Sequence, residues 1–343
     1  MYSGPMLSWE PFMPYPHAVG AILGHYGYLE PESVISRLRY STFVNLARRY
    51  MYFEVPKAAC TEMKQLLRSL EGAPPIKLVG GPETRRDLFV HVRENVPLPS
   101  LMDLDDRTQR EVLESPDFYR FTFVRNPYSR LVSTWKSKIL PCAPGHDLYE
   151  AIRGHPPELQ NKSLVTFKEF VEYISINSDL RVCNPHWRRQ VDHLLFQALS
   201  FSCIGTVENM AAGLSRFQQH LGLPEPLLLG RSNATAPTAL PTYSSKLAET
   251  VYMLYRDDFE KLGYDRNSWR AGEQVRVQTP GAGVVPEEKF YDEIIERNII
   301  ITHLFRECER LRARPRWISW NVNFISAGKR QQRHVPPVRP QQP

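Results

Sequence analysis

The chain has 343 residues, of which 42% are apolar and 11% aromatic, enough to bury one large hydrophobic core or two ordinary ones. Its formal net charge of +6 predicts attraction to anions, but no long Lys/Arg block precedes the C-terminal tail, so the charge does not indicate a nucleic-acid-binding protein. No apolar run approaches ~18 residues and the N-terminus does not resemble a signal peptide, so we expect no transmembrane segment and a cytoplasmic, bacterial-type protein.

The five cysteines argue against a protein stabilised by disulfides. Their number is odd, they form no C-x-x-C pair, and no group of cysteine and histidine residues has the spacing of a zinc site. We therefore expect a reducing compartment and no bound metal.

Residues 50–70, which follow a weakly helical N-terminal extension, predict a strand, a tight turn and a helix. Backbone N–H groups at the start of such a helix, together with its dipole, favour an anion. The turn supplies an ammonium, a hydroxyl and small residues that let an anion approach the backbone, although an ordinary turn with a solvated lysine is the alternative. The candidate residues are Lys57, Ala58, Ala59, Cys60 and Thr61.

A short strand is predicted next in "DLFVHV", at 87–92, and His91 and Glu94 lie at or just beyond its end. The aromatic and β-branched segment 118–124 predicts a further strand, which leads through Arg125 into a helix over 127–139.

Two polar groups characterise this second turn. Arg125 leaves the end of the strand, while Ser129 and Ser133 share one helical face at i and i+4. An arginine fork and a hydroxyl on a helix suit a phosphate monoester, whereas a salt-bridged arginine and a serine that caps the helix are the alternative.

The rest of the chain continues the alternation of strands and helices. A helix is predicted in "TFKEFVEYIS", a strand near 200–205, and helical structure in "SSKLAETVYMLYRDDFEKLGYD". An amphipathic helix follows in "EEKFYDEIIERNIIITHLFRECERL". Strands that alternate with helices favour a central parallel sheet covered on both faces, and hence the α/β class.

The two turns together, "VPKAACT" and "FVRNPYSRLVS", resemble the two cofactor signatures of carbohydrate sulfotransferases that use 3′-phosphoadenosine 5′-phosphosulfate (PAPS). This family includes the chondroitin 4-O- and heparan sulfate 2-O-sulfotransferases. Later segments, "NPHWRRQ", "FSCIGTVENM" and "YRDDFEKLGYD", resemble the same family in the same order, so the resemblance covers about 48–266.

The resemblance implies that the first turn holds the 5′-phosphosulfate and that Arg125 and Ser133 hold the 3′-phosphate. Arg231 and Ser232, in "GRSNATAP", resemble a loop that closes over the 3′-phosphate side. Thr206 stands where many eukaryotic members have a lysine, so the resemblance does not identify the acceptor. PAPS is then the donor, PAP the product, and no metal is required.

Sulfuryl transfer also needs a base for the acceptor hydroxyl, and histidine suits this because its pKa lies near neutral pH. His91, followed by Val92, resembles a catalytic histidine of some family members, with Lys57 neutralising the leaving oxygen. Glu94 and His186 are the alternatives for the base. Glu94, His186, Trp187 and Arg188 are also candidates for contact with the acceptor.

We therefore predict a P-loop-like sulfotransferase fold with an additional C-terminal helix, acting on a carbohydrate or glycolipid. A P-loop nucleotide kinase would need the G-x-x-x-x-G-K-[ST] loop, which is absent, and a non-catalytic relative that binds PAP or glycans is the other alternative. The expected parts are an extension (1–46), the sulfotransferase domain (47–270), a linker and helical extension (271–325) and a disordered tail (326–343).

Overall fold

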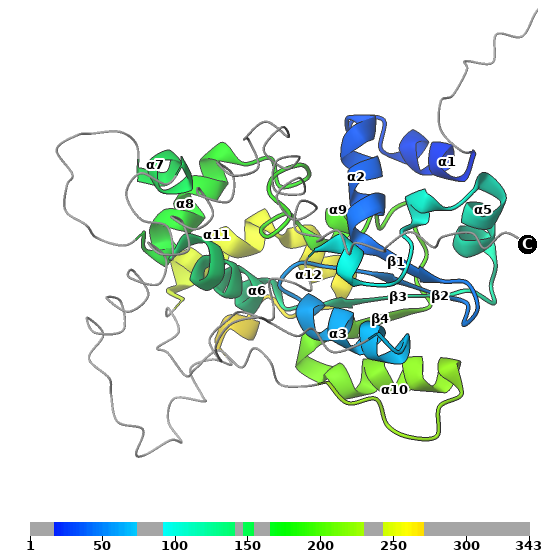
Figure 1. The fold of residues 1–343 in the computed structure, drawn as a ribbon. Coiled ribbons are helices and arrows are strands. Elements are labelled where there is room, and N and C mark those ends of the chain that lie inside the picture. Colours follow the sequence, from blue (N-terminus) through cyan, green and yellow to red (C-terminus); the bar gives the residue numbers. More distant parts are fainter. Residues whose placement is uncertain (1–16, 74–91, 141–146, 154–164, 230–242, 271–343) are drawn as a thin grey trace, which may run out of the picture. The chain divides into compact units, whose positions relative to one another are not determined.

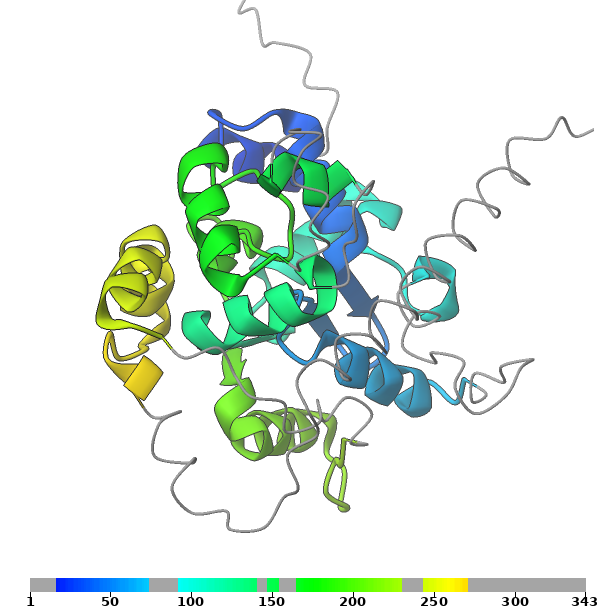
Figure 2. The same cartoon turned by 90° about the vertical axis from the view of Figure 1, so that its left-hand side faces the viewer.

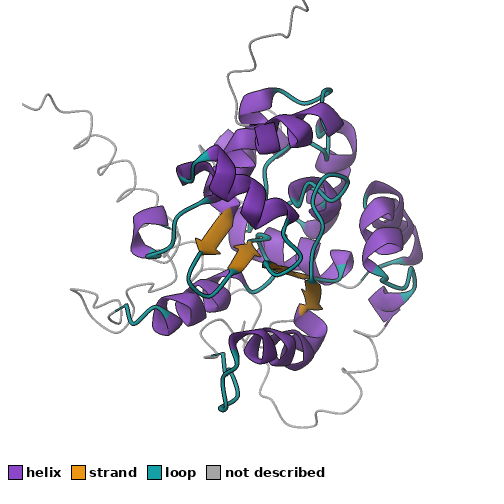
Figure 3. Ribbon diagram, turned by 90° about the vertical axis from the view of Figure 1, so that its right-hand side faces the viewer, coloured by secondary structure: helices purple, strands orange, loops and turns teal. Residues whose placement is uncertain are grey.

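The computed structural model describes residues 17–73, 92–140, 147–153, 165–229 and 243–270. At their centre lies a four-stranded β-sheet with helices on both of its faces (Figure 1 and Figure 3). The strands, in their order across the sheet, are β1 (Thr42–Asn45), β2 (Tyr50–Phe53), β3 (Tyr119–Val124) and β4 (Cys203–Thr206). The expected α/β class is confirmed.

The helices fall into two groups along the chain. Those up to β3 are α1 (His17–His25), α2 (Pro31–Ser41), α3 (Cys60–Leu70), η1 (Arg93–Asn95), η2 (Leu101–Asp103) and α5 (Asp106–Glu114). Those after β3 are α6 (Pro127–Thr134), η3 (Trp135–Ile139), α7 (Asp147–Arg153), α8 (Phe167–Asn177), α9 (Gln190–His193), η4 (Val207–Asn209), α10 (Met210–Leu221), α11 (Ser245–Leu254), α12 (Arg256–Leu262) and η5 (Ser268–Arg270).

Strand direction in the sheet is mixed. β2, β3 and β4 run parallel, as the alternation of strands and helices predicted, but β1 pairs antiparallel with β2. The expectation of an entirely parallel sheet was wrong for β1, because a short turn at 46–49 joins the two strands and so forms a hairpin. Arg49 closes this turn in the left-handed region, with φ 51°. The sheet therefore begins within the segment that the sequence analysis separated as an extension.

Side chains that alternate along the strands build a core on each face of the sheet. In β2, Tyr50 and Tyr52 pack with α3 and α10, whereas Met51 and Phe53 pack with α1, α2 and the segment after α9. In both side views α3 and α10 lie on the same side of the sheet (Figure 1 and Figure 2). Because both faces are covered, the edge formed by the carboxyl ends of the parallel strands is where a ligand can approach.

Two predicted helices change character in the structure. The helix expected over 127–139 is α-helical only to Thr134 and continues as the π-helical turn η3. The helical segment near residue 255 divides into α11 and α12 at Tyr255. No described helix is long and apolar enough to cross a membrane. Residues 87–91 of the predicted strand at 87–92, the C-terminal amphipathic helix and the tail lie outside the described residues.

Candidate active site: two turns at the carboxyl ends of β2 and β3

The turn after β2 carries unusual backbone geometry. Lys57 and Ala59 both lie in the left-handed region, with φ of 68° and 58°, although neither is glycine. Such conformations cost on the order of 1–2 kcal/mol per residue, so they persist where the surroundings require them, often at functional sites. Ala59 is the N-cap of α3 and has no side chain that could accept a hydrogen bond from the first N–H groups of the helix. Those donors suit an anion.

Lys57, which belongs to this turn, is half-buried. Burial above all, with Cys60 acting in the opposite direction and Lys138, Arg125 and Arg130 acting in the same direction, lowers its pKa to about 8. Across the part of the chain that the structure describes, no carboxylate forms an ion pair with Lys57. A partly desolvated cation that is surrounded by further cations favours the arrival of an anion.

A second lysine near the turn is held differently. The Lys64 ammonium lies 2.7 Å from the Glu54 carboxylate, and both side chains are largely buried. This pair joins α3 to the end of β2 and engages the carboxylate that precedes the turn. Burial also raises the pKa of the Cys60 thiol to about 11, so Cys60 contributes a small side chain and not a thiolate nucleophile.

The turn after β3 meets the first turn through Arg125. Its Nε donates to Ser129 Oγ at 3.0 Å, and its Nη1 donates a long hydrogen bond of 3.4 Å to the backbone oxygen of Lys57. Burial lowers the pKa of Arg125, while Glu208 acts against this. For Nη2 the described residues provide no hydrogen-bond acceptor. The structure thus brings the two predicted motifs together and leaves one edge of the guanidinium available.

The helix that follows is capped by the turn itself. Asn126 is the N-cap of α6, with its side chain accepting from the Tyr128 N–H at 3.0 Å, and Pro127 occupies the first helical position. Glu208 accepts from the Asn126 N–H at 2.9 Å. The hydroxyl of Ser133, one turn after Ser129, is half-buried and has no hydrogen bond with any described residue.

Arg130 was not assigned a role from the sequence, yet it is fully buried between three chain segments. Its guanidinium donates to the backbone oxygens of Pro56 at 3.0 Å, Pro185 at 3.0 Å and Arg188 at 2.7 Å. It therefore ties the first turn to the "NPHWRRQ" segment. Arg130 is the second arginine of the "VRNPYSRLVS" motif, so the sequence did draw attention to it. Its position in the motif, however, does not reveal the backbone oxygens that it binds.

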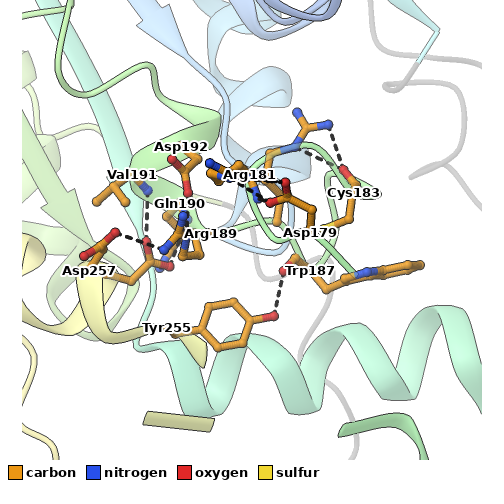
Figure 4. Close-up of polar contacts among 12 residues, drawn as sticks. Asp179, Arg181, Cys183, Trp187, Arg189, Gln190, Val191, Asp192, Tyr255 and Asp257 are labelled. Carbon is orange, nitrogen blue, oxygen red and sulfur yellow. Dashed lines mark hydrogen bonds and ion pairs between the residues drawn. The ribbon is translucent and has the colours of Figure 1, made fainter. Parts of the chain in front are cut away.

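The side chains of the "NPHWRRQ" segment turn mainly inward. Trp187 is buried against Phe170 with ring centroids 5.7 Å apart, and its backbone oxygen accepts from Tyr255 (Figure 4). Arg188 is buried as well and donates to the backbone oxygens of Val182 and Cys183. These positions favour a structural role for both side chains.

His186 is half-buried and so more accessible than Trp187 and Arg188. Its Nδ1 lies 2.8 Å from Asn184 Oδ1, which orients the ring, and its backbone oxygen accepts from Thr134 at 2.8 Å. The predicted roles of His186, Trp187 and Arg188 toward an acceptor stay predictions.

Four predicted site residues lie wholly or partly outside the described part of the chain. His91, Arg231 and Ser232 lie outside the described residues, and Glu94 is described only as part of the backbone of η1. Within the described ranges, His, Cys, Asp and Glu side chains form no group of three or more that could hold a metal ion.

Comparison with known proteins identifies the family of the chain. The profile of the sulfotransferase family matches residues 40–265. The chain belongs to this family. It is similar to carbohydrate sulfotransferase 14 of Danio rerio, with 26% identity over 64% of this chain and 61% of the relative. It is also similar to human carbohydrate sulfotransferase 9, with 27% identity over 54% of this chain and 42% of that protein.

A third relative is carbohydrate sulfotransferase 10 of Xenopus laevis, at 24% identity over 65% of this chain and 66% of the relative. The chain therefore matches less than two thirds of the length of these curated relatives. No solved structure matches it.

Proposed function

We propose that this protein is a PAPS-dependent sulfotransferase that transfers a sulfuryl group to a hydroxyl of a carbohydrate or glycolipid. The observation that carries the proposal is the contact between Arg125 and the backbone of Lys57, which joins the two turns that carry the candidate anion-binding groups at one edge of the sheet. The sulfotransferase family match and the names of the carbohydrate sulfotransferase relatives support the same reaction.

The residues of the two turns fit a nucleotide that carries phosphate at both ends. The N–H groups at the start of α3, with Lys57 and Thr61, suit the 5′-phosphosulfate, since small side chains there let an anion reach the backbone. The free edge of Arg125 and the hydroxyl of Ser133 suit the 3′-phosphate. When bound, PAPS supplies the sulfuryl group and a phosphorylated leaving group. We also propose that the fold is P-loop-like.

Lys57 acts in the proposal as the source of positive charge at the 5′ end. Sulfuryl transfer resembles phosphoryl transfer in that the protein mainly positions groups and stabilises charge. The lowered pKa of Lys57, about 8, still leaves most of its population protonated at neutral pH. The ammonium can then stabilise negative charge or donate a proton where the leaving oxygen develops charge.

The base that accepts the proton of the acceptor hydroxyl is proposed to be His91, with Glu94 and His186 as the alternatives. His91→Ala should then abolish turnover and preserve PAP affinity. His186→Ala should have the smaller effect if His91 is the base, because His186 then has no part in the proton transfer. A normal turnover of His91→Ala would remove it from the mechanism.

Two rival functions make different predictions for ligand binding. A nucleotide kinase of similar topology binds ATP with magnesium, whereas a non-catalytic relative binds PAP or glycan without transferring sulfate. Lys57 lies three residues before Cys60, the first residue of α3. In a nucleotide kinase the lysine instead comes at the end of the glycine-rich loop, directly before a Ser or Thr. The unpaired state of Lys57 among the described residues favours an active enzyme over a binding protein.

One titration and one assay separate these functions. We expect PAP to bind in calorimetry without magnesium, and ATP to compete poorly with it. Incubation with PAPS and a panel of oligosaccharides and glycolipids should give sulfated products by mass spectrometry. PAP binding without any product from an acceptor panel that includes acidic and neutral glycans would favour the non-catalytic relative. Tight ATP binding that requires magnesium would favour the kinase. The cytoplasmic location and the boundaries at 47 and 270 stay predictions.

A further inference from the structure

The side-chain amide of Gln190 forms hydrogen bonds with both backbone groups of Arg125. Its Oε1 accepts from the Arg125 N–H at 2.9 Å, and its Nε2 donates to the Arg125 backbone oxygen at 2.8 Å. Gln190 is completely buried and lies 65 residues further along the chain. A side-chain amide that bonds both polar groups of one residue imitates the pairing of a neighbouring strand.

These two hydrogen bonds lie just beyond the end of the pairing between β3 and β4. The ladder between β3 and β4 ends at the pair of Val124 and Thr206, so Arg125 is the first residue beyond the regular pairing. The paired residues of β3 and β4 thus provide no partner for its backbone N–H and oxygen. Gln190 supplies that partner at the residue whose side chain reaches toward the first turn.

Gln190 is itself held by a carboxylate from α12. The buried Asp258 accepts from the backbone N–H of Gln190 at 2.8 Å and from that of Val191 at 2.9 Å. Burial raises the pKa of Asp258 to about 6, while the two N–H bonds and Arg130 act against this. The carboxylate is therefore ionised at pH 7.5 and fixes the start of α9.

The neighbouring Arg189 strengthens the same junction between α9 and α12. It precedes α9 and lies 2.5 Å from Asp192 of that helix and 3.0 Å from Asp257 of α12 (Figure 4). A buried chain of contacts thus runs from α12 through Gln190 to the backbone of Arg125. Because both backbone groups of Arg125 are bonded, the direction in which its side chain leaves the main chain is set.

We propose that Gln190, anchored by Asp258, is a positioning residue for Arg125 and so sets the affinity of the site for the 3′-phosphate of the donor. The inference rests on the proposed function, since it needs Arg125 to face that phosphate. Gln190 touches neither phosphate in this proposal and acts only through the backbone of Arg125.

The test compares two adenosine nucleotides of which only one carries a 3′-phosphate; they also differ by the sulfuryl group at the 5′ end. PAP carries the 3′-phosphate, whereas adenosine 5′-phosphosulfate does not. Calorimetry on the full chain at pH 7.5 measures both affinities for the wild type, Gln190→Met and Arg125→Ala. We expect Gln190→Met to weaken PAP about tenfold, the effect of roughly one well-placed hydrogen bond, and to leave adenosine 5′-phosphosulfate unchanged.

A matched control separates positioning from general damage. Gln109 is also buried, and its side chain donates to the Leu104 backbone oxygen at 2.8 Å in a part of the fold away from the two turns. Gln109→Met should lower the melting temperature and keep both affinities. If Gln190→Met does not fold, Gln190→Glu is measured instead, since it keeps the shape and one acceptor but removes the donor to Arg125.

The double variant gives a readout that a merely structural role would not produce. With Arg125 already replaced by alanine, the further change Gln190→Met should weaken PAP no more, because the two residues act as one unit. Additive losses, or equal losses for both nucleotides, would overturn the positioning role. An unchanged PAP affinity in Gln190→Met, alongside a weakened Arg125→Ala, would also overturn it. A wild type that does not bind PAP at all would instead refute the proposed function.

Discussion

The two turns present their cations in different ways. Lys57 stands on a backbone in the left-handed region and has no ion pair with any described carboxylate. Arg125 is bonded at its backbone N–H, its backbone oxygen and its Nε. One turn therefore offers a mobile point charge and the other a fixed fork. A charge that must follow a departing oxygen suits the first arrangement, and a phosphate that stays bound throughout suits the second.

The largest effect should come from removing the mobile charge. Lys57→Ala is expected to lower kcat by about 10²–10³-fold, the range for loss of one charge-stabilising donor, with a smaller change in PAP affinity. Steady-state kinetics with saturating PAPS measures this. Lys64→Met is the contrast, because Lys64 is paired with Glu54 and should mainly lower the melting temperature. Equal loss of kcat in both variants would remove the distinction between the two lysines.

Removing the fixed fork should act on binding. Arg125→Ala is expected to weaken PAP by roughly 10- to 100-fold, since hydrogen bonds to a charged group contribute about 1.5–3 kcal/mol. The loss should be small for adenosine 5′-phosphosulfate, which has no 3′-phosphate. Calorimetry with both nucleotides measures the difference. A variant with unchanged PAP affinity would contradict the assignment of the second turn.

The pH dependence of the reaction sharpens the comparison further. Burial lowers the pKa of Lys57 to about 8, so its charge is present below pH 8 and is lost as the pH rises through that value. We expect kcat/KM for PAPS, which reports on the free enzyme, to fall by up to about tenfold per pH unit above pH 8. In Lys57→Arg any remaining activity should lack this decline, because arginine stays protonated. A wild-type profile that is flat to pH 9.5 would argue against an essential ammonium.

The smallest effect is expected at the hydroxyl of the second turn. Ser133→Ala should weaken PAP by about two- to tenfold, as expected for one hydrogen bond, and leave kcat nearly unchanged. Ser137→Ala is the matched control, because the exposed Ser137 bonds the Thr134 backbone oxygen and faces neither turn in the proposal. Identical affinities in the two variants would exclude Ser133 from the phosphate site.

The local structure of the two turns could be predicted from the sequence, because each turn and its flanking strand and helix form one continuous segment. A strand, a turn of small residues with Lys57, and a helix occupy one continuous segment, so hydrophobic pattern and turn chemistry predicted β2 and α3 closely. The same holds for β3, Arg125 and α6. The pairing of the two motifs indicated the family that the comparison with known proteins then showed.

Other features depend on neighbours that a local pattern does not specify. β1 was missed because its strand is short and lies in a segment with weak periodicity, so only its pairing with β2 reveals it. The change to a π-helical turn at Trp135 likewise has no local signal. Arg130 reaches carbonyls of Pro56 and Pro185 from 74 and 55 residues away.

Sequence pattern alone was thus sufficient for the strand, turn and helix at each of the two motifs, because small side chains and helix starts are decided by residues next to one another. Folding decided which groups hold those turns in place. Gln190 and Asp258 both lie in motifs that resemble the family. The hydrogen bonds from Asp258 to Gln190 and from Gln190 to Arg125 nevertheless form only because α9 and α12 pack beside the end of β3. Hydrogen bonds between such distant residues follow from packing, and packing is not encoded at any one position.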